Sequence, residues 1–210
     1  MAAAQEWKLS TGTARVFPAS DSGIMRPVIL AGAGGTGATD LAAFEAGVDH
    51  TSYSLLAALR AQGLDVILVG YNDGNAQLRD LAQAVTDCVQ RAQAERSGNA
   101  PLVAGGIGRG ALAARYALVK LERMRMYHDT ATFFSYNETA PTEQEANELN
   151  QMGDWPGIPR KLGIVSGDFT SELDLTHEGP FDFTKTGARN PGGPLVTEEL
   201  GSWLVEELAH

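Results

Sequence analysis

The 210 residues are enough for one globular domain, expected over residues 1–210, and the 43% hydrophobic fraction is sufficient for a buried core. With 26 acidic against 16 basic residues, the net charge of −10 disfavours nucleic acid and anionic membranes as partners, because phosphate binding requires clustered lysine and arginine. No apolar run approaches the roughly 18 residues of a membrane span, and Met1 to Lys8 does not resemble a signal peptide. We therefore expect a cytoplasmic protein without a membrane span.

Apolar segments of strand length alternate with helical segments along the chain. The predicted strands are residues 14–17, 27–31, 65–70, 101–104, 131–136 and 161–166. The predicted helices are residues 50–62, 75–95, 110–125 and 195–208. This alternation is typical of βαβ units. It predicts a three-layer α/β fold with a mostly parallel sheet of about six to seven strands flanked by helices.

Residues 168–194 are the least regular part of the chain, and we interpret them as a hairpin or loop. A parallel crossover needs a dozen or more residues, whereas only residues 169–176 separate Asp168 from His177. We therefore expect His177 on a hairpin and not at the end of a further parallel strand. The single cysteine, Cys88, lies among helical apolar positions and is expected to pack in the core.

The glycine-rich turn at residues 32–37 reads Gly-Ala-Gly-Gly-Thr-Gly, which contains the pattern G-x-G-x-x-G after a strand. A dinucleotide site would also need an acidic residue that ends a second strand about 20 residues later. Asp65 begins a strand instead, and residues 38–62 become helical only late. This disfavours a dinucleotide, so we predict no cofactor, and no histidine or cysteine spacing indicates a metal site.

A second glycine cluster lies between the strand at 101–104 and the helix at 110–125. A strand, a sharp turn and a helix in this order form the nucleophile elbow, written G-x-S-x-G. Residues 110–118, which read Gly-Ala-Leu-Ala-Ala-Arg-Tyr-Ala-Leu, resemble the elbow helix of α/β-hydrolases of the lipase/esterase kind. This resemblance extends over roughly residues 26–167. It places Gly106 and Gly110 on the two motif glycines and Gly108 on the serine.

The chain departs from the family pattern in three respects. Gly108 has no side chain and cannot form an acyl-enzyme. Residues 137–160 leave no room for the lid insertion that relatives commonly carry, so the lid is expected to be short. The resemblance makes Asp168 a candidate acid by its position after the late strand, whereas His177 follows it too soon for the usual arrangement.

Ligands of open α/β sheets bind at the carboxyl ends of the strands. At that edge we expect the catalytic positions Gly108 (the lost nucleophile), Arg109, Asp168 and His177. The predicted substrate-binding residues are Gly32, Ala33, Gly34, Gly35, Tyr71, Asn72, Ile107, Tyr136, Asn137 and Ser166. Arg109 is expected to add a positive charge close to Gly108.

The leading hypothesis is a diverged hydrolase fold that binds a small apolar metabolite and carries out cofactor-free, non-hydrolytic chemistry. Cyclisation or isomerisation, as in natural-product biosynthesis, is its concrete form. The physical reason is that loss of the serine leaves the elbow amides, the helix dipole and the pocket in place. One alternative is a non-catalytic binding or interaction protein. Another is a residual esterase that uses another nucleophile or water. Self-association into a homo-oligomer is left open.

Overall fold

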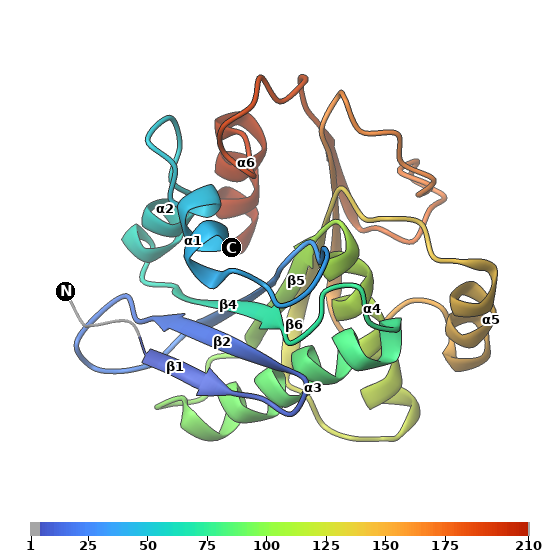
Figure 1. Ribbon diagram of the computed structural model, residues 1–210, viewed down its shortest axis with the longest axis horizontal. Helices are drawn as coiled ribbons and strands as arrows, with labels where there is room; N and C mark the ends of the chain where they lie inside the picture. The colour runs from blue at the N-terminus through green and yellow to red at the C-terminus, as the bar shows by residue number, and fades with distance from the viewer. Residues whose placement is uncertain (1–4, 210) are drawn as a thin grey trace.

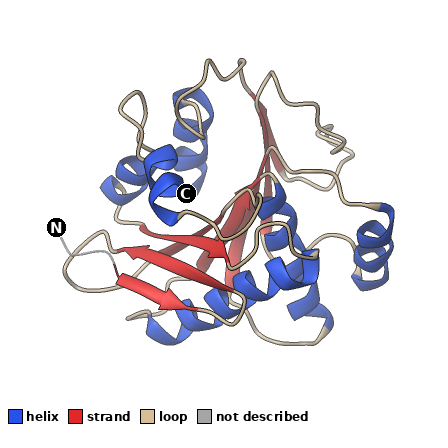
Figure 2. Cartoon of the chain, viewed as in Figure 1, coloured by secondary structure: helices blue, strands red, loops and turns tan. Residues whose placement is uncertain are grey.

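The computed structural model describes residues 5–209 and shows one mixed sheet with helices on both faces (Figure 1, Figure 2). Eight strands follow one another across the sheet in the order β1-β2-β4-β3-β5-β6-β7-β8. Their bounds are β1 Gln5–Lys8, β2 Gly12–Phe17, β3 Pro27–Ala31, β4 Asp65–Tyr71, β5 Leu102–Ile107, β6 Thr130–Tyr136, β7 Arg160–Val165 and β8 Phe183–Thr186. The strands from β4 to β8 pair in parallel, and β1 and β2 are antiparallel. This confirms the predicted α/β fold and its mostly parallel sheet.

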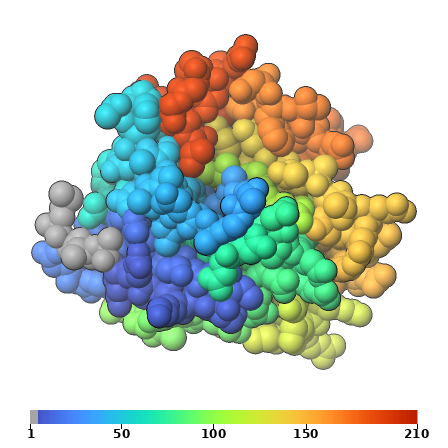
Figure 3. Space-filling view, in the orientation of Figure 1, coloured from blue at the N-terminus to red at the C-terminus, as the bar shows by residue number. Residues whose placement is uncertain are grey.

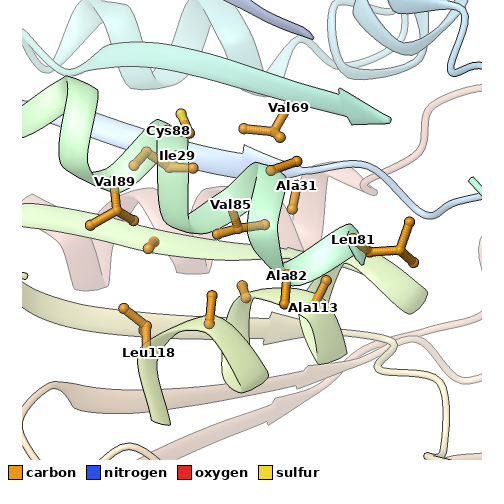
Figure 4. Close-up of a cluster of buried hydrophobic side chains, with 14 of the residues drawn as sticks. Ile29, Ala31, Val69, Leu81, Ala82, Val85, Cys88, Val89, Ala113 and Leu118 are labelled. Carbon is orange, nitrogen blue, oxygen red and sulfur yellow. The ribbon is translucent and has the colours of Figure 1, made fainter. Parts of the chain in front are cut away.

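The helices divide between the two faces of the sheet. Their bounds are α1 Leu41–Val48, α2 Leu55–Ala61, α3 Leu78–Glu95, α4 Arg109–Arg123, α5 Glu143–Met152 and α6 Glu198–Ala209. Side chains from α3 and α4 form one buried cluster with the sheet, and those of α1, α2 and α6 form the other. Figure 4 shows side chains of α3 (Val85 and Val89) and of α4 (Ala113 and Leu118) in the same buried cluster as Ile29 of β3. Cys88 is fully buried there, as predicted, and burial raises the pKa of its thiol.

The strands are apolar because helices cover both of their faces. β3 and β4 are buried along their whole length, which explains their continuous apolar sequences. Asp65 is the exception at the start of β4. Its buried carboxylate accepts hydrogen bonds from the amides of Ala19, Met25 and Arg26, at 2.7, 2.6 and 2.7 Å. A buried charge is tolerated when it is hydrogen-bonded in this way.

The prediction for residues 168–194 was wrong in one respect. β8 lies within this segment and pairs in parallel with β7, so the connection is a crossover and not a hairpin. The crossover spans residues 166–182 without a helix of its own, and three of its side chains, Leu173, Leu175 and Phe181, pack on the α3–α4 side. The spacing between Asp168 and His177 did not reveal this crossover, because the crossover continues beyond His177 to residue 182.

Two further elements differ from the prediction. Residues 41–48 form α1 although this region was expected to become helical late, and the next helix begins at Leu55 and not at residue 50. β1 was not predicted and, together with β8, raises the number of strands to eight. Both strands are four residues long, which is too short for an alternating pattern to be distinctive.

Candidate functional site

Gly108 lies at the tip of the turn between β5 and α4. Its φ of 57° and ψ of −121° belong to the left-handed half of backbone space, which L side chains rarely adopt. Its amide donates to the carbonyl oxygen of Tyr136 at 2.8 Å, and its carbonyl accepts from Ala111 and Thr139. A Cβ built on Gly108 would lie 3.5 Å from the Cβ of Ala33 and 3.6 Å from Thr139 Oγ1. The turn therefore has room for a side chain but carries none.

The glycines on either side of the tip are required by close backbone approach. A Cβ on Gly106 would lie 2.4 Å from the carbonyl carbon of Gly110, and a Cβ on Gly110 would lie 2.2 Å from the carbonyl oxygen of Gly32. These distances are far below van der Waals contact, and backbone atoms cannot yield as a flexible side chain can. The small residues of the strand-turn-helix motif thus have a structural cause in this chain.

Residues 32–40 form a loop that runs beside the tip. They line a cleft of about 400 Å³, which α1 closes with Ala43 and Phe44, and to which Leu195 contributes from the segment before α6. The turn after β4 holds the loop through bonds between Gly35 N and Gly74 O (3.3 Å) and between Gly74 N and Gly37 O (2.7 Å). In Figure 3 the loop and this turn lie against each other on the surface. The predicted residues Gly32, Ala33, Gly34 and Gly35 all line the cleft.

Two backbone amides beside the tip have no acceptor within residues 5–209. They are those of Ala33 in the loop and Arg109, the first residue of α4. The first amides of a helix lack intrahelical partners and carry the positive end of the helix dipole. Together these two N–H groups resemble the arrangement of an oxyanion hole, in which one amide follows the nucleophile and another comes from the loop after a neighbouring strand.

The side chain of Arg109 is bound to α5. Its guanidinium donates to both carboxylate oxygens of Glu145, at 3.0 and 2.5 Å. The same carboxylate accepts the amide of Thr142 at 2.9 Å, as part of the capping box that begins α5. The hydrogen bond from Arg109 lowers the pKa of Glu145 below its ordinary value. The positive charge of Arg109, which was expected close to Gly108, is therefore paired with Glu145.

A polar network joins the carboxyl ends of β6 and β7. Asn137 donates to Ser166 Oγ at 2.8 Å and accepts the Ser166 amide at 2.8 Å. Asp168 accepts the amide of Asn190 at 3.1 Å. That bond, together with one from the Ser166 hydroxyl, lowers the pKa of Asp168 below its ordinary value. Three predicted residues, Asn137, Ser166 and Asp168, are thus brought together at the expected edge.

His177 does not join this network. It is exposed in the crossover between β7 and β8, where it contributes to lowering the pKa of Asp174. The charged side chain that lowers the pKa of Asp168 is Arg189, from the loop after β8. That loop, residues 187–197, contains no histidine. Among residues 5–209 no histidine is hydrogen-bonded to Asp168.

The remaining predicted residues occupy two environments. Tyr71, Ile107 and Tyr136 are buried in the core, and burial raises the pKa of Tyr71 and of Tyr136. Asn72 is exposed and lines, with Tyr71, a second cleft of about 350 Å³ beyond residues 38–42. Two residues of the site were not predicted from the sequence. Thr139 lies beside Gly108, and Phe44 lines the first cleft. Asp40 could have indicated the helix that carries Phe44, because aspartate is a preferred N-cap residue. In the structure it caps α1 by accepting the amides of Ala42 and Ala43.

The Ala-Arg-Tyr sequence that anchored the resemblance has a structural role. Arg115 is buried and pairs with Glu138 at 2.9 Å and with Asp154, while its guanidinium stacks on the Trp155 ring at 3.6 Å. Burial raises the pKa of Glu138, although Arg115 and the Ser135 hydroxyl oppose the shift. Tyr116 donates to Glu148 on α5 at 3.0 Å. These contacts fix the segment between β6 and β7 beside the turn.

No family model matches the sequence, and a search of curated proteins finds no match either. Solved structures do resemble it. An α/β serine hydrolase without a lid from Xanthomonas campestris is 16% identical, with a TM-score of 0.61 over 99% of this chain and 92% of that one. An esterase of Pyrobaculum calidifontis is 13% identical, with a TM-score of 0.65 over 100% of this chain and 84% of that one. At these identities the likeness shows the fold alone, which is that of the α/β hydrolases.

Neither a metal site nor a membrane span is visible in the part of the chain that the structure describes. Within residues 5–209 no three histidine, cysteine, aspartate or glutamate side chains are grouped to hold a metal ion. None of the described helices is long and apolar enough to cross a membrane.

Proposed function

We propose that this chain is a diverged α/β-hydrolase-like protein without a serine nucleophile. It binds a small, largely apolar metabolite in the cleft beside Gly108 and promotes cofactor-free, non-hydrolytic chemistry such as cyclisation or isomerisation. The observation that carries the proposal is the turn itself, which keeps a left-handed tip between β5 and α4 but has only glycine there. The connection between β6 and β7 holds only α5, which supports the proposal that the lid is short.

The two unpartnered amides define what the site can do. A carbonyl oxygen placed between Ala33 N–H and Arg109 N–H would be polarised by both donors and by the start of α4. Polarisation makes hydrogen atoms on the adjacent carbon more acidic, which is the requirement for isomerisation through an enolate. Asp168, kept ionised by Asn190 and Ser166, is the candidate proton acceptor. The proposed ligand is therefore an apolar molecule with one carbonyl group.

Incubation of the purified protein with a metabolite extract of the cells that produce it tests this proposal. Mass spectrometry should show a component converted to an isomer of the same mass, or bound at stoichiometric amounts. Ala33→Phe, which fills the cleft from an exposed position, should abolish the effect. Ala94→Phe, at an exposed position on α3, is the matched control and should retain it. Conversion that persists in Ala33→Phe would contradict the proposed site.

A second candidate is a binding protein without catalysis. The lowered pKa of Asp168 favours it, because a carboxylate of low pKa is a weak general base. Stoichiometric binding without any change in the ligand, lost in Ala33→Phe, would select this alternative.

A residual hydrolase is the third candidate, favoured by the esterases among the structural neighbours. A chromogenic short-chain ester assay separates it from the other two. Robust turnover that a serine-directed inhibitor abolishes would exclude the leading proposal.

A further inference from the structure

A third cleft lies at the amino-terminal edge of the sheet, opposite the carboxyl ends where Gly108 and Asp168 lie. It has a volume of about 430 Å³ and is larger than the cleft beside Gly108. It is formed where β3, β5, β6 and β7 begin and where α6 ends. Its position separates it from every residue of the proposed function.

The lining has the composition of a small-molecule site. Most of the lining residues are apolar, and Pro101, Val103 and Ala131 among them are exposed or half-buried. The polar groups are few and include Arg26, Arg160 and Glu207. Ligand sites of proteins are concave and mostly apolar, with a small number of polar groups that fix orientation, and their volumes begin at about 300 Å³.

The two guanidinium groups are not equivalent. Arg160 is already neutralised, because it donates to the carboxylate of Glu207 at 3.3 Å and to its carbonyl oxygen at 2.5 Å. It also lies over the ring of Phe183. Arg26 makes a single hydrogen bond, from Nη1 to the carbonyl oxygen of Gln62 at 3.0 Å, and pairs with no carboxylate side chain among the described residues. Arg26 therefore keeps most of its donors for a ligand.

The backbone of Arg26 is held in place by hydrogen bonds to Asp65 at the start of β4. The buried carboxylate of Asp65 accepts the amides of both Met25 and Arg26, and Pro27 begins β3 directly afterwards. A guanidinium on a fixed backbone loses less freedom when it binds, and its planar fork matches a carboxylate in a bidentate manner. Asp65 also places a negative charge next to the backbone of Arg26, which disfavours a dianion such as a phosphate ester more than a monoanion.

From these observations we propose that this cleft binds small organic carboxylates, with Arg26 holding the carboxylate and the accessible Pro101, Val103 and Ala131 contacting an aliphatic or aromatic body. The ligand class is a monoanion with an apolar tail. Sodium hexanoate is the simplest probe of this chemistry. Hexanamide has a similar shape without the charge, and hexyl phosphate carries the same tail with a larger charge.

Titration of the ¹⁵N-labelled protein with each probe, followed by amide chemical shifts, tests the proposal. Hexanoate should shift the amides of residues 102–103 and 131–132 and saturate. Hexanamide should bind roughly tenfold more weakly, as should hexanoate to Arg26→Gln, because a charge-assisted pair contributes about this factor. Hexyl phosphate should also bind more weakly than hexanoate, because the carboxylate of Asp65 repels its second negative charge. Arg189→Gln, at the opposite edge of the sheet, should leave the hexanoate affinity unchanged.

A filling variant makes the test independent of Arg26. Ala131 lines the cleft from an exposed position, so Ala131→Trp should abolish hexanoate binding while the protein stays folded. Ala94→Trp on α3 is the control. Equal binding of hexanoate and hexanamide, shifts confined to residues 32–44, or binding that survives Ala131→Trp would overturn the proposal. These outcomes concern only the amino-terminal edge, so they are distinguishable from failure at Gly108.

Discussion

Position 108 combines a strained backbone with free space. Its positive φ would cost an L residue roughly 1–3 kcal/mol, but a Cβ there makes only ordinary contacts of 3.5 and 3.6 Å. Gly108→Ser should therefore fold with a modest loss of stability in urea denaturation. It should not gain turnover of p-nitrophenyl acetate, because no histidine in the described part of the chain is bound to Asp168 to act with it.

Gly108→Ala is the control for that variant, because it carries the same backbone strain without a hydroxyl group. Turnover by Gly108→Ser that is absent from Gly108→Ala would show that a base is in reach and that the site retains hydrolytic machinery. Equal urea midpoints for the two variants would assign the whole loss of stability to the backbone.

An ion pair between Arg109 and Glu145 links α4 to α5, in addition to the hydrogen bond from Tyr116 to Glu148. Because Arg109 lowers the pKa of Glu145 in the folded state, the pair stabilises the fold above the ordinary carboxyl pKa of 4.5. That contribution is lost as the pH falls through the lower, folded-state value. Glu145→Gln should thus lower the urea midpoint near pH 7, and the difference from the wild-type protein should shrink towards pH 3. A difference that is independent of pH would contradict a stabilising role for the charge of Glu145.

Elements with a strong apolar period were predictable, and short ones were not. The 18 residues of α3 give a clear helical pattern, and β3 and β4 are apolar throughout because helices cover both faces. α1 has eight residues and β8 has four, so tertiary packing decides their structure more than local pattern does. The glycine-rich turn was recognisable from its spacing. The Arg109–Glu145 pair was not, because the partners are 36 residues apart.

The order of the strands predicts how stability is distributed over the whole molecule. β3 and β5 lie at the centre of the sheet, with a strand on each side and helices on both faces, whereas β1 and β8 lie at its edges. Hydrogen exchange should be slowest at the amides of β3 and β5 and fastest, among the strands, at β1 and β8. Comparable protection in β8 and β5 would indicate that another chain covers the β8 edge, which would establish self-association.

The proposed function requires a hydrolase fold without a hydrolytic nucleophile. Incubation of the wild-type protein with a fluorophosphonate, followed by intact-mass measurement, tests this requirement, because the reagent labels activated serines. The mass is expected to stay unchanged, and no nitrophenol should be released from short-chain esters. A stoichiometric mass increase that maps to one serine, such as the buried Ser166 beside Asp168, together with ester turnover that the label abolishes, would contradict it.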